Sequence, residues 1–395
     1  MNDTTEFLIV GGGLEGLAIA WSLAEQGATD VTVVERATLC SGMTGKSSAV
    51  ARCHYGVPSL AAMALYGIEF MARAKDILGE DVGLRRCGYV IGVDENNVDA
   101  LKNNVAMQQG LGVDVDLLPT DRVAELWPGL YLDDFALFAH EPGSGRGEAY
   151  LTGMAYATDA RRRGVRIRQH TTVTSLLHAH DRVVGVHTET GERIDARTVV
   201  LANGAWSAAL AAGVGVDVPV CPLRTELVLV DQGDPTPDVP VLSDLVEMQY
   251  LCREPNGDLL VGNSDHSIPD YVDPDRYRDR ADDLTIERVV SRLAHRLPDM
   301  PDPRVTGSYA GVYDVTPDFN PIIGPSPVGG LFLAVGFSGH GFKIAPAVGR
   351  LAAAQLTGER VSLREVNPLD FRHARFAEQD LLQSPHPYVG ADGMR

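Results

Sequence analysis

One segment near the N-terminus constrains the fold more than any other. Residues 6–10 form an apolar run of strand length that leads directly into residues 11–16, GGGLEG. Apolar residues then recur at helical spacing up to Gly27, and a β-branched run ends on Glu35. This order of strand, glycine motif, helix, strand and acid predicts a βαβ unit with the pattern G-x-G-x-x-G at Gly11, Gly13 and Gly16.

Each part of the motif has a physical reason that points to a dinucleotide. Gly11 allows a tight turn out of the strand, Gly13 lets a pyrophosphate approach the backbone, and Gly16 lets the helix and strand pack closely. The helix N-terminus offers N–H groups and a positive dipole to phosphates. Glu35 can accept both hydroxyls of an unphosphorylated ribose, as in FAD or NAD, and would repel the 2′-phosphate of NADP.

Length, charge and cysteine usage narrow the class of protein. A chain of 395 residues is long for one domain, so we expect two. The net charge of -19 argues against a nucleic-acid partner, because phosphates would be repelled. No apolar run reaches the length of a membrane span. The segment before the first apolar run is short and polar, unlike a basic and apolar signal peptide. Five scattered cysteines without a C-x-x-C argue against a disulfide framework or a metal site and suggest a cytoplasmic protein.

A second glycine-rich loop lies near the other end of the chain. An apolar run at 331–335 leads into 336–343, GFSGHGFK, and a helix is expected from there to about Leu356. This repeats the strand–loop–helix order of the opening and predicts a second site where backbone N–H groups meet a ligand. From Asn367 the chain is polar and carries no motif.

Three stretches together resemble a known family: the opening unit at 8–35, the run VVLANGAW at 199–206, and the terminal pair YDVTPD at 313–318 and GFSGHGFK at 336–343. Their order and spacing resemble the FAD-dependent amino-acid oxidoreductases, which include glycine oxidase, D-amino-acid dehydrogenase and the enzymes that oxidise sarcosine and dimethylglycine. The terminal pair is most similar to the sarcosine oxidase branch.

The resemblance implies a mixed α/β fold with two discontinuous parts. Changes in composition near Cys87, Glu141, Val218 and Gly307 agree with it. The expected domains are a Rossmann-like FAD-binding domain of residues 1–86, 141–218 and 307–395, and an antiparallel-sheet substrate domain of residues 87–140 and 219–306.

The resemblance also assigns roles to residues. Arg52 and Lys343 match the cations that hold the substrate carboxylate, and Tyr313 matches an active-site tyrosine. His266 is placed near the site by its sequence context, although a histidine that is only packed is the commoner case. The FAD-binding residues that it implies are Gly11, Gly13, Leu14, Glu15, Gly16, Glu35, Arg36, Ser47, Ser48, Val173, Ala202, Gly204, Trp206, Gly311, Gly339, His340, Gly341, Phe342 and Lys343.

The activity implied is oxidation of the C–N bond of an amino acid or of an N-methyl or N-alkyl amino acid, a sarcosine-like secondary amine. Hydride would pass to flavin N5, and the imine that forms would hydrolyse. The electron acceptor is then oxygen or a carrier, and the chain can act as a homo- or hetero-oligomer.

Departures from the family pattern carry information too. The tethering cysteine of monomeric sarcosine oxidases would fall at Gly311, and the tethering histidine of dimethylglycine-type enzymes at Lys46, so we expect non-covalent FAD. Leu260 and Ala49 stand where the family would have a lysine and a second arginine, which puts oxygen in doubt as the acceptor.

Three other functions are compatible with part of this sequence. A nicotinamide dehydrogenase accounts for the opening unit but not for the second glycine loop. A flavin-binding subunit of a hetero-oligomeric amine dehydrogenase or oxidase complex is the main alternative, and Arg52 together with Lys343 favours catalysis over it. A tRNA-modifying flavoprotein is disfavoured by the net charge of -19.

Overall fold

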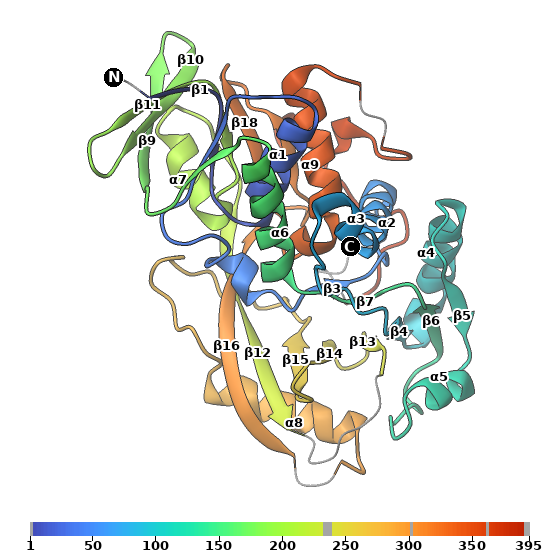
Figure 1. Ribbon diagram of the computed structural model, residues 1–395. Helices are drawn as coiled ribbons and strands as arrows, with labels where there is room; N and C mark the ends of the chain where they lie inside the picture. Colours follow the sequence, from blue (N-terminus) through green and yellow to red (C-terminus); the bar gives the residue numbers. More distant parts are fainter. Residues whose placement is uncertain (1–2, 232–238, 301–302, 361–362, 391–395) are drawn as a thin grey trace.

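The computed structural model describes residues 3–231, 239–300, 303–360 and 363–390 (Figure 1). In Figure 1 a largely parallel sheet with its helices occupies the upper half, and a second sheet with helix α8 lies below it. The mixed α/β class expected from the sequence is confirmed.

The first sheet is built around the predicted βαβ unit. Its parallel strands run in the order β18-β11-β1-β2-β8, with β17 antiparallel at one edge and the hairpin β9–β10 attached to β11. Leu8 and Ile9 are fully buried, as in strands covered on both faces. The strands are β1 (Asp3–Val10), β2 (Val31–Val34), β8 (Arg166–Arg168), β9 (Val173–Ala179), β10 (Arg182–Thr188), β11 (Arg193–Leu201), β17 (Ile322–Pro325) and β18 (Leu331–Val335).

The helices on this sheet pack closely because two glycines remove side chains between them. Helix α9 contacts both α1 and α2, and α1 also contacts α6. A Cβ on Gly349 would overlap the carbonyl of Ala18 in α1, and one on Gly67 in α2 would overlap the carbonyl of Lys343. The helices are α1 (Leu14–Glu25), α2 (Pro58–Ala72), α3 (Ala74–Leu78), α6 (Ala149–Arg162), α7 (Ser207–Ala212) and α9 (Gly341–Thr357).

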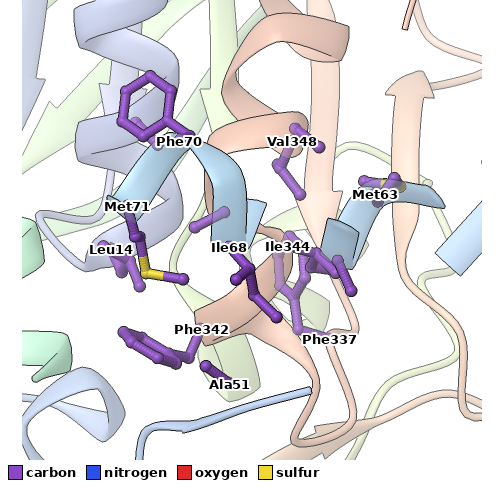
Figure 2. Packing of buried hydrophobic residues seen from close by; sticks show 14 of the residues in the cluster. Leu14, Ala51, Met63, Ile68, Phe70, Met71, Phe337, Phe342, Ile344 and Val348 are labelled. Atoms are coloured by element: carbon purple, nitrogen blue, oxygen red, sulfur yellow. The ribbon is translucent and has the colours of Figure 1, made fainter. Parts of the chain in front are cut away.

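Apolar side chains fill the space between these helices. Figure 2 shows Ile68 and Met71 of α2 pointing toward Phe342 and Ile344 in the first turns of α9. All four are buried members of one hydrophobic cluster. Burying side chains of this size is worth about 1.5–3 kcal/mol each, so the start of α9 is held firmly.

The second sheet has the strand order β16-β12-β15-β14-β13-β4-β6-β5. It is antiparallel, as expected, except that β13 and β4 pair in parallel, with Val241 opposite Tyr89. One face packs on α8, where Val289 and Leu293 join the core of the sheet. Its strands are β4 (Tyr89–Val93), β5 (Asp116–Leu118), β6 (Leu137–Glu141), β12 (Cys221–Asp231), β13 (Val241–Asp244), β14 (Gln249–Arg253), β15 (Leu259–Asn263) and β16 (Arg304–Val315).

A separate two-stranded sheet and further helices accompany the two large sheets. Strands β3 (Val50–Ala51) and β7 (Gly145–Arg146) pair antiparallel, and the remaining helices are α4 (Val98–Gly110), α5 (Thr120–Leu126) and α8 (Asp283–Arg296). Strands at 89–141 and at 221–315 share the second sheet, but the exact domain boundaries stay a prediction. In the described part of the chain, no helix is both long and apolar enough to cross a membrane.

The segment after Asn367 is more deeply packed than its polar sequence indicates. Phe371 and Arg375 have no exposed surface, and Tyr388 is 6% exposed. Arg375 forms an ion pair with Asp318, and the Tyr388 hydroxyl lies 2.7 Å from His54 Nε2. The C-terminal segment is therefore packed into the core, against Asp318, His54 and strand β17.

Candidate active site

A cavity of about 590 Å³ lies where the carboxyl ends of β1, β2 and β11 face the second sheet. Val10, Val34 and Ala202 line it from the parallel sheet, and Tyr250 and Tyr313 line it from the other. Ligands of open α/β sheets bind at the carboxyl ends of the strands, and the volume lies in the usual range for such sites. This cavity is the candidate cofactor site.

The glycine motif has the geometry that its sequence predicts. Gly11 has φ +114°, and a Cβ there would overlap the carbonyl of Ala202. A Cβ on Gly16 would overlap the carbonyl of Gly11, so this glycine lets the helix approach the strand. A Cβ on Gly13 would have only Thr44 Oγ1 near it, at 3.2 Å, which leaves the cavity side of the backbone open to a ligand.

Glu35 lies at the end of β2 and lines the large cavity. Its carboxylate accepts the N–H groups of Gly12 and Ala37, each at 2.8 Å. These two bonds fix the carboxylate at the cavity wall, and oxygen lone pairs remain to accept ribose hydroxyls.

We expect Glu35→Ala to weaken FAD binding by about 1.5–3 kcal/mol, because hydrogen bonds to a charged group are lost. The measurement is a fluorescence titration of the flavin-free protein with FAD. Glu287→Ala, at an exposed position of α8, is the control. Equal affinities for the Glu35 variant and the wild type would contradict the assignment.

The start of α1 is less open than the sequence suggests. The N–H of Leu14 donates to Thr44 Oγ1 at 3.0 Å, so it is not free for a phosphate. Burial, with Asp314 nearby, raises the pKa of Glu15 to about 7, and burial raises the pKa of Asp314 to about 6. Both acids line the cavity, and the raised pKa of Glu15 leaves it partly protonated near neutral pH, which reduces the negative charge that an incoming pyrophosphate meets.

Most of the predicted FAD-binding residues meet at this one cavity. Gly16 acts behind it through packing, and His340 and Lys343 line a smaller neighbouring cavity instead. Those that line the large cavity are Gly11, Gly13, Leu14, Glu15, Glu35, Arg36, Ser47, Ser48, Val173, Ala202, Gly204, Trp206, Gly311, Gly339, Gly341 and Phe342.

The smaller cavity, of about 80 Å³, adjoins the large one. It brings together all four residues predicted to act on substrate: Arg52, Lys343, Tyr313 and His266. Both cavities share the wall residues Ser48, Tyr250, Tyr313 and Gly339. A small molecule held here would therefore lie beside one end of a ligand in the large cavity.

Two buried cations line the smaller cavity. Arg52 and Lys343 are 6% and 5% exposed, and both lie over the ring of Tyr55, at 4.3 Å and 5.5 Å from its centroid. Burial opposes the charge of Arg52, but Tyr55, Tyr89 and Glu141 raise its pKa. Burial and the nearby Arg52 lower the pKa of Lys343 well below its usual value.

The other titratable side chains of this cavity favour their neutral forms. Burial lowers the pKa of His266, and burial together with Lys343 and Arg52 lowers that of His340 further. Burial raises the pKa of Tyr313, which keeps its hydroxyl protonated. The ring of His266 stacks on Phe319 at 6.4 Å, so the histidine forms a fixed wall of the cavity.

Sequence reasoning missed much of the wall opposite the cations. The missed residues are Ser243, Tyr250, Asn263, Ser264, Phe319 and Ser338. Of these residues, Ser338 lies in the glycine-rich loop at 336–343 described above. The others lie in strands and loops whose sequence shows no local pattern.

Comparison with known proteins agrees with this geometry. The family model described as FAD dependent oxidoreductase matches residues 6–355. The chain belongs to this family. It is thus an FAD-dependent oxidoreductase, and the glycine motif, Glu35 and the cavity fit such a dinucleotide.

Individual relatives align with most of the length of this chain. It is 30% identical over 364 residues to 4-methylaminobutanoate oxidase (formaldehyde-forming) of Paenarthrobacter nicotinovorans, covering 87% of this chain but only 42% of that enzyme. It is 28% identical to glycine oxidase of Geobacillus kaustophilus, covering 89% of this chain and 93% of the relative. The crystal structure of L-proline dehydrogenase from P. horikoshii superposes with a TM-score of 0.87 at 25% identity, covering 97% of this chain and 100% of the other.

Gly311 and Lys46, the two positions that the family resemblance matches to flavin-tethering residues, line the large cavity and offer no suitable nucleophile. The atoms nearest a Cβ on Gly311 would be those of Lys46 and Met43, and Lys46 Nζ donates to Tyr277 Oη at 2.7 Å and to the carbonyl of Ala310 at 2.9 Å. Cys40 also lines the cavity, but burial raises the pKa of its thiol to about 12, which makes it a poor nucleophile.

We therefore expect FAD to be released when the purified protein is precipitated with acid. Yellow flavin should appear in the supernatant, and the pellet should be colourless. Flavin that remains with the washed pellet, or a flavin-bearing peptide after proteolysis, would contradict non-covalent binding.

Proposed function

We propose that this chain oxidises the C–N bond of a small amino acid or N-alkyl amino acid with bound FAD. The observation that supports it most is the meeting of Arg52 and Lys343, which are 291 positions apart in the sequence (343 minus 52), at one small cavity beside the cofactor cavity. Burying two cations side by side is unfavourable, because both lose solvation and repel each other. A carboxylate on the substrate would relieve both costs.

The proposed roles follow from the chemistry of the side chains. Arg52 can donate parallel N–H bonds to a carboxylate, and Lys343 adds a point charge when protonated. Tyr313 and His266 bound the space in which the substrate's amine and its reacting C–H would lie. FAD would supply the acceptor for the hydride. Gly341 opens α9, Gly339 lies just before it, and both line the large cavity, so their backbone N–H groups and the helix dipole would stabilise negative charge that develops on a ligand there.

The size of the smaller cavity limits the substrate. A water molecule needs roughly 10–15 Å³ on this measure, so about 80 Å³ holds a molecule of only a few heavy atoms. Amino acids as small as glycine, sarcosine or proline fit this limit. The relatives named above, whose own substrates are such amines, support the same class.

The test is anaerobic mixing of the purified flavoprotein with a panel of small primary and N-methyl amino acids. We expect at least one of them to bleach the flavin absorbance, whereas methylamine and dimethylamine, which lack the carboxylate, should not. A flavin that dithionite bleaches but no amino acid does would contradict the proposal. It would favour a flavin-binding subunit that needs a partner, in which turnover appears only on reconstitution.

A further inference from the structure

Four basic side chains line the smaller cavity, and no carboxylate is among its lining residues in the described part of the chain. Arg52, Lys343, His266 and His340 all line it. Among the described residues, no carboxylate forms an ion pair with Lys343, and no hydrogen bond of its Nζ to another side chain is present. The charged and titratable groups near Lys343 are Arg52 and Tyr55, and His340 at the N-cap of its own helix; Tyr313 of β16 and His266 of the loop after β15 line the same cavity.

The two cations differ in what compensates them. Glu141 is a fully buried acid on β6 that acts on Arg52, and Arg52 also donates to the carbonyl of His54. Lys343 has only the ring of Tyr55 at 5.5 Å, and its strongest electrostatic neighbour is another cation. Burial and Arg52 lower the pKa of Lys343 well below its usual value, so its ammonium form is disfavoured unless an anion lies beside it.

The reaction proposed for this site requires a group that accepts a proton from the substrate. An amino acid in solution carries an ammonium group, and that nitrogen has no lone pair to form the C=N bond as hydride leaves the adjacent carbon. The amine must lose one proton before oxidation. A buried lysine whose ammonium form is disfavoured without an anion is a suitable acceptor, because it gains the substrate carboxylate as a counter-ion in the same event.

We propose that Lys343 accepts the proton of the substrate's ammonium group as the substrate enters the smaller cavity. One N–H bond of the substrate breaks, one N–H bond forms at Nζ, and no electrons are transferred. The resulting lysine ammonium then pairs with the substrate carboxylate, and the amine is left neutral. This inference rests on the proposed function, since it assumes an amino-acid substrate at this site.

Proton transfer to Lys343 would also change how ligand binding depends on pH. A carboxylate without an ammonium group brings no proton, so its binding must take one from solvent to charge Lys343. An amino acid brings its own proton, so its binding should take up none. Above the pKa of Lys343 in the empty site, the Kd of the plain carboxylate should therefore rise about tenfold per pH unit, while that of the amino acid stays constant until its own amine titrates.

The experiment uses trimethylacetate and 2-aminoisobutyrate, which differ only in a methyl group replaced by an ammonium group. Neither has a Cα–H to oxidise, so the flavin stays oxidised. Isothermal titration calorimetry of the holoenzyme, in buffers with different ionisation enthalpies, gives the number of protons taken up for each ligand bound. We expect about one proton taken up with trimethylacetate and about none with 2-aminoisobutyrate.

Variants identify the acceptor. Lys343→Arg carries a permanent charge, so uptake with trimethylacetate should disappear while binding persists. Lys102→Met, at an exposed position of α4, should behave as wild type. Equal uptake for the two ligands in the wild type, or unchanged uptake in Lys343→Arg, overturns the inference while leaving the proposed function standing. Failure of both ligands and of all small amino acids to bind overturns the proposed function with it.

Discussion

Replacing Asp318 by asparagine is expected to lower the free energy of unfolding by about 3–5 kcal/mol, the usual effect of breaking a buried ion pair from one side. Asp318 and Arg375 have no exposed surface, and the carboxylate accepts Arg375 Nε at 2.7 Å and Nη2 at 2.9 Å. It also accepts the N–H of Leu382 at 3.0 Å. An amide cannot satisfy the guanidinium in the same way, so the variant leaves a buried charge without its partner.

Urea denaturation of the holoenzyme near neutral pH measures this change. Asp380→Asn, which breaks an exposed pair with Arg372 on the same segment, should change stability by less than about 1 kcal/mol. Burial opposes the ionised form of Asp318, but Arg375 lowers its pKa below the usual value. The pair's contribution is therefore complete above the ordinary carboxyl pKa and is lost as pH falls through the lower folded value. Equal stabilities of the two variants would contradict the role of the pair.

Replacing Lys343 by methionine is expected to cost about 2–5 kcal/mol in kcat/KM for the amino-acid substrate, because the carboxylate loses a charged partner in a buried site. Methionine keeps much of the length and apolar surface of the lysine stem, so the packing of α9 against α2 should survive. Unchanged circular dichroism and unchanged FAD content would establish that the fold and cofactor site are intact. Lys102→Met is the matched control for loss of one lysine.

The parts of this structure that local sequence patterns specify were predictable. Strand β1, the glycine motif and helix α1 follow from periodicity and from positions where only glycine fits, and α9 was expected to within a residue of its observed end at Thr357. Gly11 and Gly16 occupy positions where any side chain would overlap a carbonyl oxygen, so their role could be inferred from residue type alone.

Other parts depend on contacts between distant segments and leave no local signal. Asn263 reaches the smaller cavity because β15 ends there, which depends on the register of the second sheet. Arg375 lies in a polar segment, and its partner Asp318 is 57 positions away. Arg52 and Lys343 could be placed together only through the family resemblance, because the sequence around each residue does not indicate that the two side chains meet.

The most direct test of a carboxylate site at Arg52 and Lys343 compares an amino-acid substrate with its amide. The measurement is the rate of anaerobic flavin reduction by each, in the wild type and in Lys343→Met. The wild type should strongly prefer the acid, and the variant should lose that preference because the rate with the acid falls. The rate with the amide should change little, because an amide offers no carboxylate to pair with a protonated Lys343 and so gains nothing from this lysine. If Lys343→Met slows both substrates by the same factor, the cations do not bind the carboxylate and the account of this site is wrong.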